Sequence, residues 1–343
     1  MEFAKNGIKV IFLLFGFSLP TLPLMKFFIF GIRASNPYRH EMHLIKISPG
    51  ISPNEVTRIL LNHGIIANGK KFIWLGKLGR FWKSLKAGEY RLSPHQSPFK
   101  IFHVLTSGVN AFYPLTIREG ENIYEISEKI KKKGLGQKKI FLSLCKNREF
   151  IQSLGLFDTD SIPPSLEGYL FPETYFFDRS LTEAEMIQTM VKQFLLNWNP
   201  HKQLRLHTLQ ISRHHLIILA SMIEKEAGCS LERPIISSVF HNRIKKKMRL
   251  QSCATAAYGI WHRFQGKIHK TDLWEKNKYN TYRIKNLPIG PIANPGNAAI
   301  HAALYPTKTN YLYFVSHNNG THTFSETLVA HNRAVKKYQL NAQ

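Results

Sequence analysis

The chain has 343 residues, 43% of them hydrophobic, with 47 lysines and arginines against 22 aspartates and glutamates. This composition excludes a disordered chain, and the length allows two domains or one large domain with an appendage. The formal net charge of +25 indicates anionic surroundings such as nucleic acid, lipid headgroups or an acidic polymer. The cysteines, Cys145, Cys229 and Cys253, form no C-x-x-C pair, so we expect no disulfide framework, no metal site and no cofactor.

The N-terminal stretch is apolar. Sixteen uncharged residues, Val10–Met25, are followed after Lys26 by the apolar Phe27–Ile32. A membrane-spanning helix needs about 20 residues, a length that is reached if the helix continues to the end of this stretch. A cleaved signal peptide is the alternative, but no A-x-A cleavage site follows. We therefore predict that residues 1–34 form a short cytoplasmic tip and a single-pass membrane anchor.

A strand–turn–helix pattern occurs twice, in residues 47–65 and again 70 residues later in 117–135. Each copy predicts a short strand, a turn that contains glycine, and an amphipathic helix ended by a C-cap glycine, Gly64 or Gly134. Units of this kind form small α+β modules. The strand–helix order of the first copy resembles a LysM-like carbohydrate-binding fold.

Aromatic residues gather between the two copies. Trp74, Phe81, Trp82 and Tyr90 lie on either side of a turn at Ala87-Gly88, and a further helix is predicted over 97–108. Such aromatics could stack on sugar rings if they are exposed. The alternative is that they fill the core of a small domain, where large aromatic side chains bury much apolar surface.

The second half begins with an apolar segment, Leu166–Phe177, whose only charged residues are Glu167 and Glu173. Its pattern fits a loop or strand that lines a groove, with the two acids as polar groups in that groove. Pairing of both acids with nearby basic residues is the alternative. Helices are predicted next over Thr182–Trp198 and Leu204–Ala227.

The end of the second of these helices carries two acids. Leu216–Ile223 has no charge and is too short to cross a bilayer, so it predicts a buried core helix. Successive helical residues turn by about 100°, so the carboxylates of Glu224 and Glu226 should point about 200° apart and serve different clefts. Glu224 shares a stripe with small apolar residues, where burial would raise its pKa as a general acid requires. The alternative is that both acids solvate the helix end.

The remaining elements follow in order. We predict an amphipathic helix over 232–245, a turn of small polar residues over 249–259, an irregular loop over 287–296, a strand over 311–315 that continues after a turn at 322–324, and a closing helix over 327–338.

Many short motifs stand in one order along this half: Glu167-Gly-Tyr-Leu-Phe-Pro-Glu-Thr-Tyr175, Ala220-Ser-Met-Ile-Glu-Lys-Glu226, Glu232-Arg233, Val239-Phe240-His-Asn-Arg243, Met248-Arg-Leu-Gln251, Tyr279-Asn-Thr-Tyr282, Leu287-Pro288, Gly290-Pro-Ile-Ala-Asn-Pro-Gly296, Tyr311-Leu-Tyr-Phe-Val315 and His322-Thr-Phe324. Together they resemble the YceG-like endolytic murein transglycosylase family, also called MltG. The resemblance extends from the N-terminal anchor to Tyr338.

The resemblance implies a single-pass enzyme of the cell inner membrane with its catalytic part in the periplasm. It would cut nascent peptidoglycan glycan strands internally at the MurNAc–GlcNAc bond and leave a 1,6-anhydro-MurNAc end, which could terminate elongation. It places the catalytic glutamate on the first acid of the E-K-E pair, Glu224. Many members have an acid and a proline where this chain has Cys253 and Ala254, so any auxiliary role of that acid is in doubt here.

One carboxyl is enough for this chemistry. An ordinary glycosidase needs two carboxylates, whereas a lytic transglycosylase uses the C6 hydroxyl of the sugar as nucleophile. We predict that Glu224 protonates the leaving oxygen and then takes up the C6 proton. Gln251, Asn280 and Tyr282 would position the N-acetyl group and sugar hydroxyls, and Glu173 would line the groove.

The predicted fold class is therefore α+β. It comprises an N-terminal transmembrane helix in 1–34, a LysM-like module in 43–112, and a larger mixed α+β catalytic domain in 113–340, with the second repeat copy at 113–160 and the catalytic core at 161–340. The expected partners are glycan strands, the membrane and peptidoglycan synthases.

Other functions fit part of the sequence. A non-catalytic wall-binding scaffold shares every feature except a working acid, and a hydrolase would add Glu167 or Glu173 as a second carboxylate. A nucleic-acid binder has only the charge in its favour, and the N-terminal anchor opposes it. A pyridoxal-dependent lyase would need a phosphate-cradling loop, which the sequence lacks.

Overall fold

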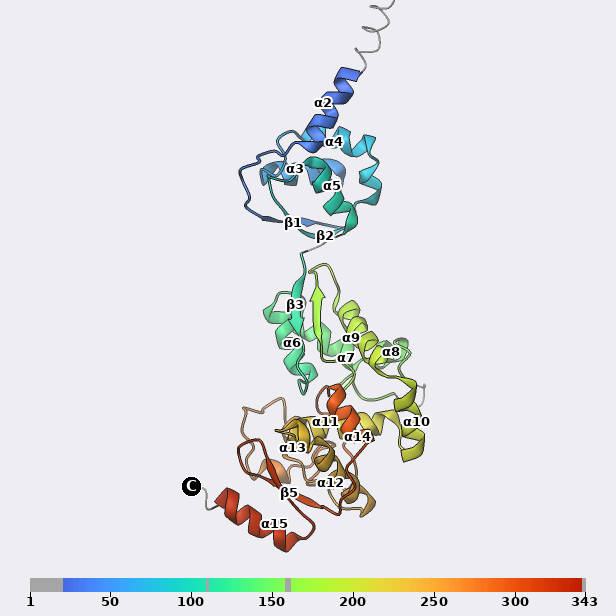
Figure 1. Cartoon of the computed structure of the whole chain (residues 1–343), viewed down its shortest axis with the longest axis vertical. Coiled ribbons are helices and arrows are strands. Elements are labelled where there is room, and N and C mark those ends of the chain that lie inside the picture. The colour runs from blue at the N-terminus through green and yellow to red at the C-terminus, as the bar shows by residue number, and fades with distance from the viewer. Residues whose placement is uncertain (1–20, 109–110, 158–161, 341–343) are drawn as a thin grey trace, which may run out of the picture. The chain divides into compact units, whose positions relative to one another are not determined.

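The computed structural model describes residues 21–108, 111–157 and 162–340. The described chain is α+β and mostly helical, and its strands form three two-stranded sheets. It divides into two compact units (Figure 1). The N-terminal unit runs to Tyr113 and includes Asp178–Ser180, and the C-terminal unit comprises Pro114–Phe177 and Leu181–Gln343.

The N-terminal unit consists of helices packed against one antiparallel pair of strands. Its elements in chain order are α2 (Thr21–Ile32), β1 (His43–Ile47), α3 (Pro53–Asn62), α4 (Gly69–Leu78), a 3-10 turn (Phe81–Ser84), β2 (Gly88–Leu92) and α5 (Pro98–Ser107). Strands β1 and β2 pair with Ile45 opposite Tyr90. Ile45 and Ile47 are buried while the residues between and before them are not, because alternate residues of a strand face opposite sides of the sheet.

Most of the aromatic residues near the Ala87-Gly88 turn belong to this core. Phe72 and Phe102 stack with ring centroids 4.2 Å apart, and Trp82 meets Phe102 edge to face at 5.1 Å. Tyr90 is fully buried. Core packing is therefore the structural role of these rings, whereas Trp74 on α4 is exposed.

The two predicted strand–turn–helix copies are both present. The first is β1 followed by α3, and the second is β3 (Tyr113–Thr116) followed by α6 (Ile123–Lys132). Both helices end in a left-handed glycine, Gly64 with φ 66° and Gly134 with φ 62°. In each case the next residue donates its N–H to the carbonyl five residues before it, Ile65 to Leu60 and Leu135 to Ile130. This is the Schellman motif expected from the glycine spacing.

The C-terminal unit contains most of the helices. Its further elements are α7 (Lys138–Lys146), α8 (Arg148–Ser153), β4 (Thr174–Phe177), α9 (Glu183–Asn197), α10 (Pro200–Leu209), α11 (Arg213–Glu226), α12 (Arg233–Lys245), α13 (Cys253–Gly259), α14 (Asn297–Leu304), β5 (Tyr313–Ser316), β6 (His322–Ser325), α15 (Leu328–Val335), a π turn (Lys336–Leu340), and 3-10 turns at Ser230–Glu232 and Asp272–Trp274. Strand β3 pairs with β4, and β5 pairs antiparallel with β6.

Helix α11 forms the centre of this unit. Its residues Leu216–Ile223 are all buried, as the uncharged run predicts, and α10, α12, α13 and α14 pack around it. The irregular loop 287–296 is also present, and its final part is largely buried beside α11, where Ile292 N–H donates to Ser221 Oγ at 3.1 Å.

Two predicted elements are wrong. Leu204–Ala227 is not one helix, because Gln210 has a left-handed φ of 55° and Ser212 begins α11 as its N-cap by accepting a hydrogen bond from His215 N–H. The small residues after Ser252 form helix α13 and not a turn. Alanine-rich sequence has high helix propensity, which the prediction of a turn overlooked.

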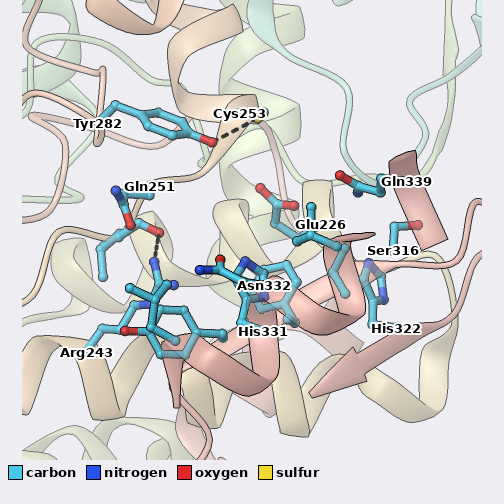
Figure 2. Close-up of a pocket in the computed structure, with 16 residues that line it drawn as sticks. Glu226, Arg243, Gln251, Cys253, Tyr282, Ser316, His322, His331, Asn332 and Gln339 are labelled. Atoms are coloured by element: carbon cyan, nitrogen blue, oxygen red, sulfur yellow. Dashed lines mark hydrogen bonds between the residues drawn. The ribbon is translucent and has the colours of Figure 1, made fainter. Parts of the chain in front are cut away.

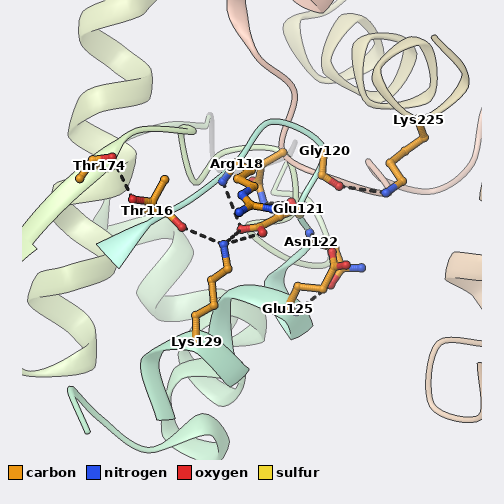
Figure 3. A network of polar contacts seen from close by, with 10 residues as sticks. Thr116, Arg118, Gly120, Glu121, Asn122, Glu125, Lys129, Thr174 and Lys225 are labelled. Carbon is orange, nitrogen blue, oxygen red and sulfur yellow. Dashed lines mark hydrogen bonds and ion pairs between the residues drawn. The ribbon is translucent and has the colours of Figure 1, made fainter. Parts of the chain in front are cut away.

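A polar network joins the segment before α6 to α11 (Figure 3). Lys129 Nζ donates to Glu121 Oε2 at 2.6 Å and to Thr116 O at 2.8 Å. Lys225, in the last turn of α11, donates from Nζ to Gly120 O at 3.1 Å. These bonds fix the loop before α6 against the end of the helix that carries the two candidate acids.

Among the described residues, no helix has the length and apolar character that crossing a membrane requires. The predicted anchor in 1–34 lies largely outside the described residues, which begin with α2 at Thr21.

Candidate active site

The last turn of α11 presents Glu224 and Glu226. The helix ends at Glu226 because Ala227 has an extended backbone, with φ −77° and ψ 110°. The two carboxylates have different surroundings, as the 100° turn per residue predicts. Each of the two carboxylates therefore has its own set of contacts.

Glu224 is held by protein groups on both of its oxygens. Its Oε1 lies 3.0 Å from Nη2 of Arg233, at the start of α12, and its Oε2 accepts a hydrogen bond from Gly296 N–H at 3.0 Å. The side chain is only 5% exposed. Glu224 thus connects α11, α12 and the end of the 287–296 loop. It does not contribute to the wall of the cavity described next.

Glu226 lines an open cavity of about 480 Å³ (Figure 2). The volume falls within the range of about 300–1,000 Å³ that is typical of ligand sites. The cavity is lined by Glu226, Arg243, Leu250, Gln251, Cys253, Tyr282, Tyr313, Phe314, Val315, Ser316, His322, Leu328, His331, Asn332, Val335 and Gln339. Glu226 is the only carboxylate among these residues, and aromatic rings with several hydrogen-bonding groups surround it, as carbohydrate recognition requires.

The surroundings of Glu226 raise its pKa. Burial is the main cause, because it disfavours the charged carboxylate. Ser252 Oγ donates to Glu226 Oε1 at 2.5 Å and, with the positive charges of His322 and Arg243, opposes the rise. A carboxyl with a raised pKa keeps its proton nearer to neutral pH and can act as a general acid.

Two basic residues of the cavity wall are rigidly held. His322 Nδ1 lies 2.7 Å from Glu232 Oε2, and its backbone N–H donates to Oε1 of the same carboxylate at 3.0 Å. Arg243 donates from Nε to Leu312 O at 2.6 Å and from Nη1 to Leu250 O at 2.8 Å. Their positions relative to the cavity are therefore fixed without a ligand.

Three of the predicted binding residues lie at or behind the cavity. Gln251 and Tyr282 line it, and Tyr282 OH lies 3.1 Å from Cys253 Sγ. Gln251 has a left-handed φ of 51°, a conformation that is uncommon for a residue with a side chain and often marks a functional position. Asn280 is fully buried and does not line the cavity. Its Oδ1 accepts from Tyr282 N–H at 3.0 Å and its amide donates to Glu275 O at 2.7 Å, so it positions the segment that carries Tyr282.

The other two acids of the sequence analysis lie elsewhere. Glu173 is exposed beside β4, where its Oε1 accepts from Thr174 N–H at 3.0 Å, and it does not line the cavity. Glu167 is fully buried, and burial raises its pKa to about 8. Its carboxylate accepts from Tyr258 OH at 2.7 Å and Asn294 Nδ2 at 3.1 Å. Glu167 is therefore a buried structural residue of the core. It neither lines the cavity nor, within the described part of the chain, forms an ion pair with a basic residue, so both alternatives given for it are wrong.

The sequence analysis considered Glu226 beside Glu224, but it did not single out Arg243, Ser252 or His322, which surround Glu226 in the structure. Arg243 and His322 stood in the motifs quoted above, but their spacing along the chain gave no sign that they share one cavity. The prediction of Glu224 came from a stripe of small residues on α11 and from the family resemblance. Because α11 is buried on all sides over Leu216–Ile223, no stripe distinguishes one helix face from another. The geometry favours Glu226 over Glu224 as the acid of this cavity.

The fold and the cavity define an α+β protein in which one acid at the end of a buried helix faces a cavity of ligand size. The YceG-like family matches residues 45–337, and the chain belongs to this family. It is 34% identical over 305 residues to a Bacillus subtilis protein named endolytic murein transglycosylase, covering 86% of this chain and 84% of that protein.

Two further comparisons agree. A Streptococcus pneumoniae (serotype 2, strain D39) protein of the same name is 28% identical over 302 residues, covering 79% of this chain and 54% of that protein, so the chain spans about half the length of this relative. The crystal structure of a yceG-like protein from Listeria monocytogenes is similar with a TM-score of 0.60 and 33% identity, covering 85% of this chain and 99% of that one.

Proposed function

We propose that this chain is an endolytic lytic transglycosylase of peptidoglycan. It would cut the MurNAc–GlcNAc bond of nascent glycan strands and leave a 1,6-anhydro-MurNAc end, a cut that terminates elongation. Membership of the YceG-like family and the names of its relatives support the reaction class. The observation that carries the mechanism is that Glu226 is the only carboxylate among the described residues of the cavity wall.

Glu226 acts first as the acid and then as the base. Its proton goes to the glycosidic oxygen as the bond from MurNAc C1 to that oxygen breaks, which releases the GlcNAc hydroxyl. The C6 hydroxyl of the same MurNAc then attacks C1, and its proton returns to the Glu226 carboxylate. A C1–O6 bond replaces the C1–O4 bond, no water is consumed, and the carboxyl ends in its starting state.

A hydrolytic mechanism fits the cavity less well. Inverting and retaining glycosidases need a second carboxylate within about 5–9.5 Å of the first, to activate water or to attack the sugar. The candidates for that group were Glu167 and Glu173, and neither lines the cavity. Gln251 and Tyr282, which line the cavity, would contact the sugar, and Asn280 accepts a hydrogen bond from the backbone N–H of Tyr282.

The rest of the chain fits the same proposal. The order β1–α3–α4–β2 of the N-terminal unit supports a LysM-like module that binds the glycan. We retain residues 1–34 as a single-pass anchor in the inner membrane, with the catalytic part in the periplasm and peptidoglycan synthases as partners. The net charge of +25 would favour anionic lipids and the carboxylates of stem peptides.

Digestion of purified glycan strands, followed by mass spectrometry of the new ends, tests this proposal. The wild-type chain should give anhydro ends. Glu226→Gln should lose roughly 1,000-fold in rate, because general acid–base catalysis contributes about 10²–10⁴ in each step. Glu224→Gln is the matched control and should keep its turnover per folded molecule.

Each other result has a definite meaning. Ends that carry an added water would indicate a hydrolase, and intact strands would indicate the non-catalytic scaffold. Full activity of Glu226→Gln together with an inactive, folded Glu224→Gln would return the assignment to Glu224.

A further inference from the structure

The N-terminal unit contains a second cavity, of about 260 Å³, between α2, α4 and the start of α5. Apolar side chains form one part of its wall, with Ile29 and Phe30 from α2 and Ile66 from the segment before α4. Arg33, Ser35 and Lys71 form the polar part. The two cations and the hydroxyl suit a phosphate group, and the apolar wall beside them suits a hydrocarbon chain attached to that phosphate.

The charges at this cavity are not neutralised by acids. Neither Arg33 nor Lys71 forms an ion pair with an acid among the described residues, and Lys71 Nζ instead lies 5.8 Å from the centroid of the Phe30 ring. The sequence from 56 to 88 contains seven basic residues and no acid. The electrostatic potential at the cavity is therefore positive, and it favours the binding of an anion from outside the chain.

An exposed apolar face borders the same cavity. On α4, Lys71, Trp74 and Leu78 are three and four residues apart and share one side of the helix, with Trp74 58% and Leu78 61% exposed. On α2, Met25, Phe28, Ile29 and Ile32 are exposed with the same spacing. Exposed tryptophan with neighbouring lysine is typical of protein surfaces that lie at the level of lipid headgroups.

We propose that this cavity binds the phosphate of an anionic phospholipid, and that Trp74 and Leu78 enter the outer part of the bilayer beside it. Arg33 and Lys71 contact the phosphate, Ser35 donates a hydrogen bond, and Ile29, Phe30 and Ile66 contact the start of the acyl chains. Charge complementarity selects an anionic lipid over a neutral one. The proposal concerns the N-terminal unit alone and is independent of glycan cleavage.

Quenching of tryptophan fluorescence by brominated lipids tests the proposal on the full chain in vesicles. The vesicles contain phosphatidylcholine with a minority of phosphatidylglycerol, and the bromines are placed on the acyl chains of one lipid at a time. The signal lost in Trp74→Phe identifies the contribution of Trp74, and Trp274→Phe, at an exposed residue of the C-terminal unit, is its control. We expect brominated phosphatidylglycerol to quench the Trp74 contribution more strongly than brominated phosphatidylcholine.

Charge variants then test the cavity. Each basic residue near an anionic membrane adds to the binding free energy. Removing two of them should therefore weaken association with the anionic lipid roughly 30-fold. Arg33→Gln/Lys71→Gln should therefore lose the excess quenching, whereas Arg33→Lys/Lys71→Arg should keep most of it. Lys245→Gln/Lys246→Gln removes the same charge from the exposed last residue and C-cap of α12 and should change nothing.

Four results would overturn the proposal. These are an unquenched Trp74, equal quenching by the two lipids, equal losses in the two glutamine variants, and loss of the excess quenching when inorganic phosphate is added at constant ionic strength. The last result would assign the cavity to free phosphate. Thermal unfolding of each variant establishes that it is folded.

Discussion

Glu224 and Glu226 lie two residues apart at the end of α11, yet one carboxylate is 3.0 Å from Arg233 and the other faces an open cavity. The two acids of the E-K-E motif therefore have different contacts. Glu224 binds the start of α12 and the end of the 287–296 loop, whereas Glu226 lines the open cavity.

We predict that the hydrogen bond from Ser252 to Glu226 affects the upper pH limit of activity. Ser252→Ala removes a donor that stabilises the carboxylate, so the pKa of Glu226 should rise further. A hydrogen bond to a charged group contributes about 1.5–3 kcal/mol, which corresponds to about one to two pH units. Since the acid must be protonated, the alkaline limb of the rate profile should move to higher pH by about that amount.

Measuring the initial rate of anhydro-end formation from pH 5 to 9 would check this shift. Ser316→Ala, at a cavity hydroxyl on β5, serves as the control and should leave the limb in place. A limb that stays fixed in Ser252→Ala, or that moves to lower pH, would show that Glu226 is not the group that titrates.

The ion pair of Glu224 should contribute to stability. Glu224→Gln leaves the mostly buried guanidinium of Arg233 with only the more distant carboxylate of Glu119, whose Oε2 lies 4.0 Å from Nη2, and breaking a buried pair costs about 3 kcal/mol. Denaturant unfolding followed by circular dichroism measures the loss. The exposed pair of Glu128 with Lys138 provides a control, since Glu128→Gln should change stability much less than Glu224→Gln. Equal effects of the two substitutions would contradict a supporting role for Glu224.

Glu167 should make stability depend on pH. Its folded-state pKa of about 8 lies above its ordinary value of 4.5, because burial favours the neutral form. Between these values the folded chain holds a proton that the unfolded chain releases, so the contribution of Glu167 is complete below pH 4.5 and is lost as pH rises through 8. The slope can reach about 1.4 kcal/mol per pH unit.

Glu167→Gln should remove that slope. The free energy of unfolding, measured in denaturant at pH 5, 6, 7 and 8, should fall less steeply in Glu167→Gln than in the wild type. Glu173→Gln, at an exposed acid of the same segment, should retain the wild-type slope. Parallel curves for Glu167→Gln and the wild type would mean that Glu167 is ionised in the folded state.

Local patterns predicted the elements better than the site. Glycine spacing located the ends of α3 and α6, and an uncharged run located α11, because backbone geometry and burial are decided within a few residues. The cavity joins Glu226 on α11, Gln251 before α13 and His322 on β6. No periodicity relates residues so far apart in the chain, and only the motifs of a known family pointed to them.

The choice between the two acids depended on information that the sequence does not contain. Periodicity can identify the buried face of a helix only when another face is wet, and α11 is enclosed over eight residues. Glu224 is paired with Arg233, and the approach of Arg233 depends on how α12 packs on α11. A tertiary contact therefore distinguishes the surroundings of the two acids, because Glu224 is held in an ion pair and Glu226 lines the cavity.

Cys253 offers a chemical test of the cavity. Its side chain is on the cavity wall with Tyr282 OH 3.1 Å from the sulfur, whereas Cys145 is buried in the core. N-ethylmaleimide on Cys253 would occupy space that the glycan needs. We therefore expect at least a tenfold loss in the rate of anhydro-end formation, which corresponds to about 1.4 kcal/mol in the activation free energy. Burial raises the pKa of the Cys253 thiol, and the reaction should therefore accelerate as pH rises, because the thiolate is the nucleophile.

Two cysteine variants separate the cavity from other sites. Cys253→Ala should keep its own untreated activity after exposure to N-ethylmaleimide, and Cys229→Ala should remain as sensitive as the wild type. Mass spectrometry of the treated chain identifies the modified cysteine. If Cys253→Ala is inactivated at the wild-type rate, the reagent acts elsewhere. If Cys253 is fully modified while activity persists, the glycan does not enter the cavity beside Glu226, and the acid proposed for the reaction must be sought on another surface.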